Sequence, residues 1–502
     1  MKFPRYTGII LILATIGLLV AVNAGHLSRL PFDHHGFRQT QTLSTIEIYA
    51  EQGIDPLHPR TNYEGEPGTF VLEFPIFQML AALLYRIFGE HLVLIRLLNI
   101  FITLGSAAMV VLITRRFLSG PVALLAGFIY LTAPLNDMYM SAILFDPLCI
   151  LMALGCFYCA LGLLQGEKDP WWLRRIGLMS LAIMVGITKA LYLFPVLVLI
   201  AVLGGRRRAE RWKTAALLIA AMVPSGICFL LWNWHCNRVN GASPFTAGLE
   251  PTSLLGFSSL FTTSWYVTMG KRLLGECIGP LGGILVLIGW CWAGITALRS
   301  RRLEAAQLPL IITLLTVAGY WLCFPNINFP HNYYSLIMVP FLSIAAAMTI
   351  MQFCEWLKPA KFAGLVFLLL GLATGGASAA FFLDRRGFPE PATMLTLWDR
   401  GRGAFHHGDY AMLFMAESLS PFEGNRHEIP HALYAIGLRG SAWTVADGDV
   451  AQEFWKEYRP DYRHLHYVVF YGLPPVPEIT QEFSKVVISN ATDQIYGFEP
   501  KD

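Results

Sequence analysis

Long apolar runs, each close to the length of a membrane-crossing helix, fill most of this sequence. A helix needs about 20 apolar residues to cross the hydrocarbon core of a bilayer. We expect about eleven such helices on that criterion, over residues 8–25, 92–113, 121–135, 147–165, 173–189, 190–204, 214–235, 278–298, 307–324, 334–353 and 361–382. Of the 502 residues, 55% are hydrophobic and 14% are charged, whereas soluble domains have about 25% charged residues. The sequence therefore predicts an α-helical polytopic membrane protein.

Basic residues predict how these helices are oriented, because short cytoplasmic loops concentrate Lys and Arg. The basic clusters fall on one side of the membrane if the run 71–88 does not cross it. Glu73, Pro75 and Arg86 also suit an amphipathic helix at the membrane surface. The first loop, residues 26–91, then lies on the outer, periplasmic side of a bacterial inner membrane.

The same charge rule divides residues 173–204 into a hairpin. Both ends of this stretch are basic, so both belong inside, and Lys189 marks the outer turn. Because the basic residues are spread over short loops and form no extended stripe, nucleic acid is not an expected partner.

The C-terminal quarter is more polar and predicts a separate domain. We expect a transmembrane domain over 1–383 and a small periplasmic α/β domain over 384–502. Residues 441–445 and 466–472 alternate in the manner of strands. Residues 447–459 predict a helix between them, capped by Asp447 or Asp449.

Asp33 is the first candidate for chemistry, since it follows the first apolar run by eight residues. A carboxylate held at the membrane surface could act as a general base on an acceptor hydroxyl. The local sequence equally fits a loop carboxylate paired with Arg38, or a turn after Pro31. Both interpretations stay open at this stage.

Asp146 and Lys189 are the next candidates, and the predicted topology places both on the side of Asp33. Asp146 precedes a proline at the start of an apolar run, so it could cap a helix or act in a site. Lys189 could pair with a phosphate or with Asp146, or extend to the interface.

The segment from His331 to Tyr334 brings donors and aromatic rings to the same outer face. His331 could hydrogen-bond a lipid phosphate, and Tyr333 could orient a substrate, although an interfacial aromatic belt also explains tyrosines. In the first loop, His34, Arg38 and Glu73 are further candidates. His34 and His35 are adjacent, which is a poor arrangement for two ligands of one metal.

A base, a second carboxylate and several cations on one membrane face are what sugar transfer from a lipid phosphate requires. The acceptor hydroxyl must lose a proton, and the departing phosphate must be stabilised. Lys or Arg can neutralise that phosphate, so no cofactor is required, and a divalent metal is the less favoured alternative.

An ordered set of motifs strengthens this interpretation. After Asp33 come EFP at 73–75, RIFG at 86–89, Arg96, a long run at 115–135, Asp146-Pro147, Thr188-Lys189 and HNYYSLIMVP at 331–340. In this order they resemble the GT-C membrane glycosyltransferases, in particular glycosyltransferase family 39. That family contains protein O-mannosyltransferases and the aminoarabinose transferases that act on lipid A.

The resemblance implies a metal-independent, inverting transfer from a polyprenyl-phosphate sugar, with Asp33 as the base. Lys189, His331 and Arg38 would hold the donor phosphate, and Asp146, Glu73, Tyr333 and His34 would orient these groups or touch the sugar. The sequence departs from the family at two points. His34 stands where Glu often follows the Asp, and Phe74 replaces a Lys of the aminoarabinose branch.

The expected acceptor is a hydroxyl of a glycolipid, a polysaccharide or a protein. The alternatives are an oligosaccharyl transferase or O-antigen ligase, and a flippase or transporter for lipid-linked sugars. A transporter is expected to place polar sites near mid-bilayer, whereas here the polar residues gather at one face.

Overall fold

The computed structural model describes residues 6–33, 35–166, 171–204, 209–241, 256–300, 307–356, 362–385, 391–419 and 429–501. Its contacts divide the chain into two compact units. The membrane unit comprises Met1–Leu27, Arg96–Asn237 and Gly241–Gly387. The loop–sheet unit comprises Ser28–Ile95, Arg238–Asn240 and Phe388–Asp502. The first loop therefore groups with the C-terminal region, and the predicted functional boundary between residues 383 and 384 stays a prediction.

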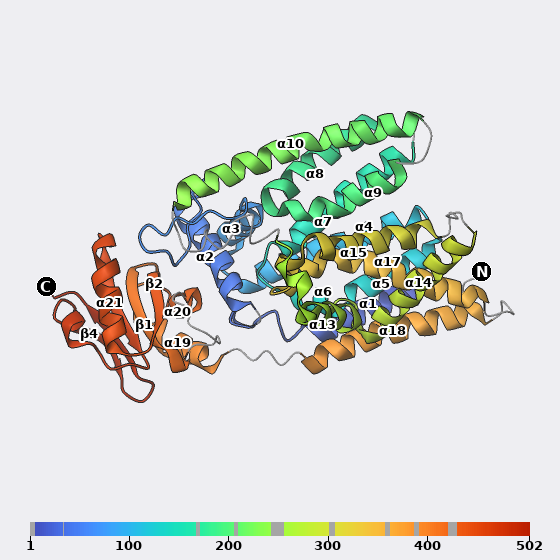
Figure 1. The fold of residues 1–502 in the computed structure, drawn as a ribbon. Coiled ribbons are helices and arrows are strands. Elements are labelled where there is room, and N and C mark those ends of the chain that lie inside the picture. The colour runs from blue at the N-terminus through green and yellow to red at the C-terminus, as the bar shows by residue number, and fades with distance from the viewer. Residues whose placement is uncertain are drawn as a thin grey trace. The chain divides into compact units, whose positions relative to one another are not determined.

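All eleven predicted apolar segments are helical where the structure describes them (Figure 1). They are α1 (Thr7–Asn23), α4 (Leu92–Arg115), α5 (Gly120–Leu131), α7 (Asp146–Leu164), α8 (Trp171–Lys189), α9 (Phe194–Gly204), α10 (Ala209–Asn240), α14 (Gly279–Ser300), α15 (Leu308–Cys323), α17 (Val339–Trp356) and α18 (Ala363–Arg385). Within the described residues, 7 helical stretches are long and apolar enough to cross a membrane. The predicted helical membrane fold is confirmed, and the number of crossings stays a prediction.

Short helices connect the long ones at several ends. These are α6 (Pro134–Tyr139), η1 (Ala190–Leu193), η2 (Ser258–Phe261), α13 (Thr263–Lys271), the π-helical η3 (Arg272–Glu276), α16 (Pro325–Asn328) and η4 (Asn332–Met338). As the charge pattern predicts, α8 ends at Lys189, and η1 separates it from α9. Both α8 and α9 pack against α7.

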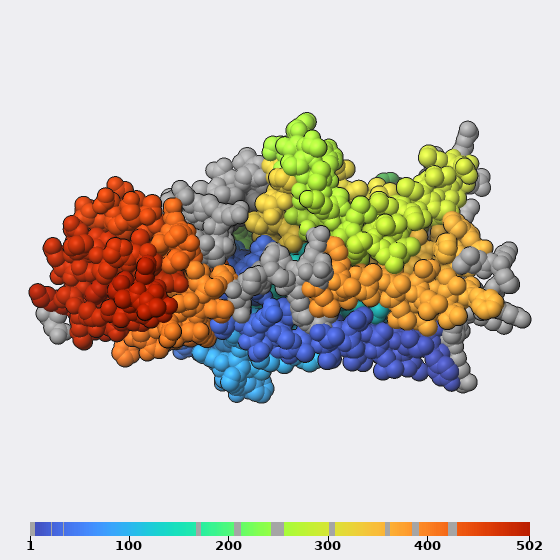
Figure 2. Space-filling model, turned by 90° about the horizontal axis from the view of Figure 1, so that it is seen from below, coloured from blue at the N-terminus to red at the C-terminus, as the bar shows by residue number. Residues whose placement is uncertain are grey.

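The stretch formed by η4 and α17 lies at the centre of the membrane unit. Of its 18-residue apolar window, 89% is buried. The apolar stretch of α10 is 17% buried, so this helix lies at the edge of the bundle, as Figure 1 shows. On another face, α1 lies beside α18, visible as dark blue beside orange in Figure 2.

The loop–sheet unit starts with two helices of the first loop, α2 (Gly36–Gln52) and α3 (Ile76–Phe88), which pack together. Helix α3 has 13 residues, too few to span a bilayer of ordinary thickness. It buries Phe77 and Tyr85 and leaves Leu83 and Ile87 exposed. This amphipathic pattern agrees with the predicted surface helix.

A five-stranded sheet forms the rest of this unit, in the order β2-β1-β3-β5-β4. The strands are β1 (Tyr410–Ala416), β2 (Arg439–Val445), β3 (Leu465–Tyr471), β4 (Lys485–Asn490) and β5 (Ile495–Glu499). The pairs of β1 with β2 and with β3 are parallel, and the pairs of β5 with β3 and with β4 are antiparallel. A core that includes Phe414, Trp443 and Phe470 lies on the sheet.

Helices cover and connect these strands: α19 (Ala392–Gly401), η5 (Glu417–Leu419), α20 (Pro430–Ile436), α21 (Gly448–Tyr458), η6 (Arg459–Asp461) and α22 (Pro477–Thr480). The carboxylate of Asp447 accepts hydrogen bonds from the backbone N–H groups of Asp449 and Val450. The predicted helix, its cap and the α/β character of the C-terminal region are therefore confirmed.

Candidate active site

A buried ion pair joins the start of α7 to the end of α8. Asp146 lies in the first turn of α7, and Pro147 follows it at a position where a missing backbone N–H costs nothing. Lys189 is the last residue of α8, and its ammonium is ion-paired with the Asp146 carboxylate. The Asp146 side chain is 2% exposed, and the Lys189 side chain is 10% exposed. Of the alternatives that the sequence left for Lys189, the structure contains the pair with Asp146.

Four aromatic rings surround the Lys189 ammonium. Its Nζ lies 4.6 Å from the ring centroids of both Tyr333 and Tyr334, and 5.0 and 5.2 Å from those of Phe145 and Tyr192. At such distances the ring faces attract a cation. The Tyr192 hydroxyl lies 3.3 Å from an oxygen of Asp146 and donates to the backbone oxygen of Tyr333 at 3.1 Å. The cage therefore holds a cation and a carboxylate away from bulk water.

His331 extends this cluster on the far side of Tyr333. The two rings stack with centroids 5.2 Å apart and an angle of 19° between their planes. The structure thus brings four predicted residues together, Asp146, Lys189, His331 and Tyr333, although they come from three separate parts of the chain.

A second cation beside this segment did not stand out in the sequence. Arg272, in η3, is buried and donates to the backbone oxygens of Asn328 and Phe329, just before His331. Its Nε lies 3.8 Å from Glu276, which in turn accepts from Asn332 at 3.5 Å. In the sequence Arg272 follows Lys271 between two predicted spans, and the backbone oxygens that it bonds lie more than 50 residues away. We assign it to the support of the His331 segment.

Asp33 lies in the loop–sheet unit, in the turn that precedes α2. It is partly buried, and its Oδ1 accepts a hydrogen bond from Nε2 of Gln39 at 2.5 Å. The backbone N–H of Gly36 donates to the backbone oxygen of Asp33 at 2.8 Å. This turn fixes where the carboxylate points relative to α2. The predicted contribution of His34 falls outside the described residues.

Arg38 and Glu73 form an ion pair in the same unit, with 2.5 Å between Nη2 and Oε2. Arg38 also donates to Oε1 of Gln41 at 2.5 Å, and Gln78 donates to Glu73 at 3.1 Å. Arg38 and Glu73, both predicted site residues of the first loop, are thus direct partners. The side-chain amides of Gln41 and Gln78 hydrogen-bond to them.

A small polar pocket that is partly open to solvent adjoins this ion pair. Hydroxyls and amides make up much of its wall, and the lining residues include Arg38, Gln41, Thr42, Thr45, Thr61, Glu73 and Gln78. Among the described residues, the buried Oγ1 of Thr42 and Oε1 of Gln78 have no hydrogen-bond partner. Because buried polar atoms are normally hydrogen-bonded, this pocket is built for a polar ligand or water.

Two groups of candidate residues result, one in each unit. Asp33, Arg38 and Glu73 belong to the loop–sheet unit, and Asp146, Lys189, His331 and Tyr333 belong to the membrane unit. That both groups line one chamber stays a prediction. Within the part of the chain that the structure describes, no group of three or more His, Cys, Asp or Glu side chains could hold a metal ion.

The described residues form a helical bundle with seven membrane-length stretches and a small α/β region. Together with the buried Lys189–Asp146 pair, these features define a polytopic membrane protein with a polar site. Residues 72–237 match the dolichyl-phosphate-mannose-protein mannosyltransferase family. No curated protein is similar to the chain in sequence.

Solved structures identify the fold. ArnT from Cupriavidus metallidurans bound to undecaprenyl phosphate is similar with a TM-score of 0.63 and 13% identity, over 98% of this chain and 97% of that one. The apo form of ArnT is similar with a TM-score of 0.60 and 14% identity, over 96% of this chain and 97% of that one. The Archaeoglobus fulgidus oligosaccharyltransferase complexed with Zn and sulfate is similar with a TM-score of 0.53 and 12% identity, over 95% of this chain and 68% of that one.

At such low identities the structural likeness shows the fold alone. The chain shares the fold of ArnT, a GT-C glycosyltransferase, so the predicted GT-C type of fold is confirmed.

Proposed function

We propose that the chain transfers a sugar from a polyprenyl-phosphate donor to a hydroxyl group of an acceptor, with inversion at the anomeric carbon. The observation that carries this proposal is the buried Lys189–Asp146 pair in its aromatic cage, next to His331. Its context supports the proposal, since a similar fold binds undecaprenyl phosphate in ArnT.

The departing phosphate is the group that needs cations. Lys189 carries three donor positions, and a phosphate oxygen near its Nζ would compete with Asp146 for them. His331 stacks on the ring that faces Lys189 and would supply a further donor. Arg38 is the third proposed phosphate ligand. In a site shielded from water, such fixed charges stabilise a developing phosphate far better than they do in solution.

Asp33 is the proposed general base. The acceptor oxygen attacks the anomeric carbon, and its proton passes to the Asp33 carboxylate. The bond between the anomeric carbon and the phosphate oxygen breaks, and its electron pair leaves with the phosphate. One displacement of this kind inverts the anomeric configuration. The hydrogen bond from Gln39 would hold the carboxylate in the orientation for proton transfer.

Glu73, Tyr333 and His34 complete the proposal as residues that orient the sugar or the cations, together with Asp146. The polar pocket beside Glu73 contains a hydroxyl and an amide oxygen that have no hydrogen-bond partner in the described part of the chain, which suits sugar hydroxyls. The proposed chemistry needs no metal, since the cations named above neutralise the phosphate.

The proposed location is the inner membrane of a bacterium, with the site and the sheet domain on the periplasmic side. The charge bias of the loops supports this orientation. The acceptor would be a glycolipid, a polysaccharide or a protein that reaches this face.

Binding of undecaprenyl phosphate to the purified full-length protein tests the donor half of the proposal. We expect saturable binding, which Lys189→Met weakens at least tenfold and the exposed-face variant Lys456→Met leaves unchanged. Mass spectrometry of envelope glycolipids and proteins from a deletion strain tests the other half. A sugar mass that disappears there, and returns with the wild-type gene, would identify the donor sugar and the acceptor.

Equal undecaprenyl phosphate binding by wild type and Lys189→Met would contradict the assigned phosphate site. If a whole oligosaccharide rather than one sugar were lost, the protein would be an oligosaccharyl transferase or ligase instead.

A further inference from the structure

Helix α20, in the C-terminal region of the chain, lies against the turn that carries Asp33. Both belong to the loop–sheet unit, and α20 packs against α2. All seven residues of α20 are buried, although the helix lies near the start of a small domain. A short helix enclosed to this degree is typical of an element that other parts of the fold use as a support.

An aromatic group holds the residue next to Asp33. Phe32 is 2% exposed, and its ring meets those of Trp398 and Tyr434 edge to face, at 6.1 and 6.2 Å. Trp398 and Tyr434 stack on each other at 6.1 Å, and the Arg402 guanidinium lies 4.1 Å from the Trp398 ring. Phe32 is thus fixed by side chains that are about 370 to 400 positions later in the sequence.

His431 holds the other end of the turn. This residue is 2% exposed, and its ring lies 5.9 Å from that of Phe37. A Cβ atom at Gly36 would lie 3.0 Å from Cδ2 and 3.2 Å from Nε2 of His431. A side chain at this position would force the ring to move by a few tenths of an ångström, so glycine suits the observed approach. Nearby, the side chain of Asn62 donates to the backbone oxygen of Pro430 at 2.9 Å.

The turn between these contacts has an unfavourable backbone conformation. His35, at the N-cap position of α2, has φ 57° and ψ 33°, which is the left-handed region that residues other than glycine seldom adopt. Such a conformation is unfavourable and persists where the surroundings hold it. Phe32 precedes His35 and contacts Trp398 of α19 and Tyr434 of α20. Gly36 follows His35 and lies against His431 of α20.

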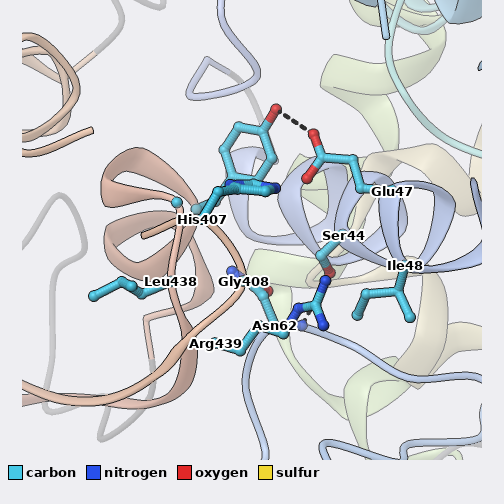
Figure 3. Close-up of a pocket in the computed structure, with 10 residues that line it drawn as sticks. Ser44, Glu47, Ile48, Asn62, His407, Gly408, Leu438 and Arg439 are labelled. Carbon is cyan, nitrogen blue, oxygen red and sulfur yellow. Dashed lines mark hydrogen bonds between the residues drawn. The ribbon is translucent and has the colours of Figure 1, made fainter. Parts of the chain in front are cut away.

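A second set of contacts fixes α2 further along its length (Figure 3). The Tyr434 hydroxyl donates to Oε1 of Glu47 at 3.0 Å, the dashed line in the figure. Arg439 donates to Glu51 at 2.6 Å, and His407 lies 3.3 Å from the same carboxylate. These contacts hold α2 at Glu47 and Glu51, and so they also fix the helix to which the Asp33 turn is joined.

We propose that His431 and the aromatic pair Trp398 and Tyr434 are positioning residues for Asp33, so that the C-terminal domain is a working part of the active site rather than an accessory module. This inference rests on the proposed function for the role of Asp33. The packing itself does not depend on that function, and it can be tested separately.

Hydrogen–deuterium exchange of the full-length protein in detergent tests the packing. We expect His431→Ala to raise the rate of deuterium uptake at least tenfold in peptides that cover residues 31–40, and to leave the uptake of α21, residues 448–458, unchanged. His466→Ala, on the exposed position of β3, serves as the matched control. Unchanged exchange in residues 31–40 of His431→Ala would overturn the proposal, whether or not the protein is a transferase.

Trp398 provides a variant pair that separates a positioning effect from loss of folding. Trp398→Phe keeps an aromatic ring against Phe32, and Trp398→Ala removes it. We expect Trp398→Phe to retain product formation by membranes, and Trp398→Ala and His431→Ala to lose about a hundredfold, as misplaced catalytic groups do. We also expect the acidic limb of the pH–rate profile, which the Asp33 carboxyl would set, to move in His431→Ala.

Normal activity and an unchanged profile in both alanine variants, with faster exchange at the turn, would contradict the positioning role. An inactive wild-type protein with the predicted exchange pattern would instead contradict the proposed function and leave the packing result in place.

Discussion

Lys189 and Asp146 are ion-paired between the end of α8 and the start of α7, and four aromatic rings enclose the ammonium. Removing two charges from water is costly, and a buried pair is weak evidence for stability by itself. Under the proposed function, each charge of this pair would hold the other until a phosphate binds.

The pair predicts a specific pattern of stability. Lys189→Met would leave the Asp146 carboxylate buried without its cation, which costs about 3–5 kcal/mol. Adding Asp146→Asn removes that charge, so the double variant should recover most of the lost thermal stability and still fail to transfer sugar. Thermal unfolding in detergent and product mass spectrometry measure the two effects. Additive destabilisation in the double variant would contradict the coupling.

The polar pocket beside Glu73 predicts a loss of activity without a loss of stability. Thr42→Val has a similar shape and removes the buried hydroxyl that has no partner among the described residues. A sugar hydroxyl that bonds to this group would lose its partner, so we expect product formation to fall at least tenfold. The unfolding temperature should stay close to that of the wild type.

Thr492→Val, at an exposed position between β4 and β5, is the matched control for this experiment. If Thr42→Val, like Thr492→Val, transferred sugar at the wild-type rate, the pocket would have no role in substrate binding.

The junction of α2 and α20 predicts a dependence of stability on pH. Burial raises the pKa of Glu47 from 4.5 to about 7. The groups that face it are Tyr434, Arg402, His407 and Glu90. The folded state therefore binds the Glu47 proton more tightly than the unfolded state, so this contribution falls as the pH rises from about 4.5 to about 7. A hydrogen bond to Glu51 raises the pKa of His407 above 6.5, and its contribution is likewise lost as the pH rises further.

We expect the unfolding temperature to decrease between pH 5 and pH 8, and Glu47→Gln to flatten the lower part of that curve. The shift of the Glu47 pKa corresponds to about 3 kcal/mol at most. Glu457→Gln, on α21, controls for the change of net charge. The same slope in Glu47→Gln as in the wild type would contradict the assignment.

Local sequence features predicted the elements better than their contacts. Apolar runs gave the helices, basic loop residues gave the break after Lys189, and Asp447 gave the start of α21, because each depends on neighbours in the chain. The same charge pattern placed Asp146 and Lys189 at one end of the bundle, where they meet.

Most contacts of the site could not be predicted, since they join distant segments. The rings of Tyr333 and Tyr334 beside Lys189 come from far along the chain, and the bond from Asn62 to Pro430 spans 368 residues. The role of Arg272 depends in the same way on the packing of η3 against the segment before His331. Periodicity and composition contain no information on such contacts.

Under the proposed function, Asp33 removes the proton of the acceptor. A deletion strain complemented with Asp33→Asn tests this role, with its envelope products compared by mass spectrometry with those of the wild type. Asp55→Asn, an exposed carboxylate of the same loop, serves as the control, with the amount of each protein measured in membranes. We predict that Asp33→Asn lowers product by about 10²–10⁴-fold and that Asp55→Asn does not. Wild-type amounts of product from Asp33→Asn would contradict the claim.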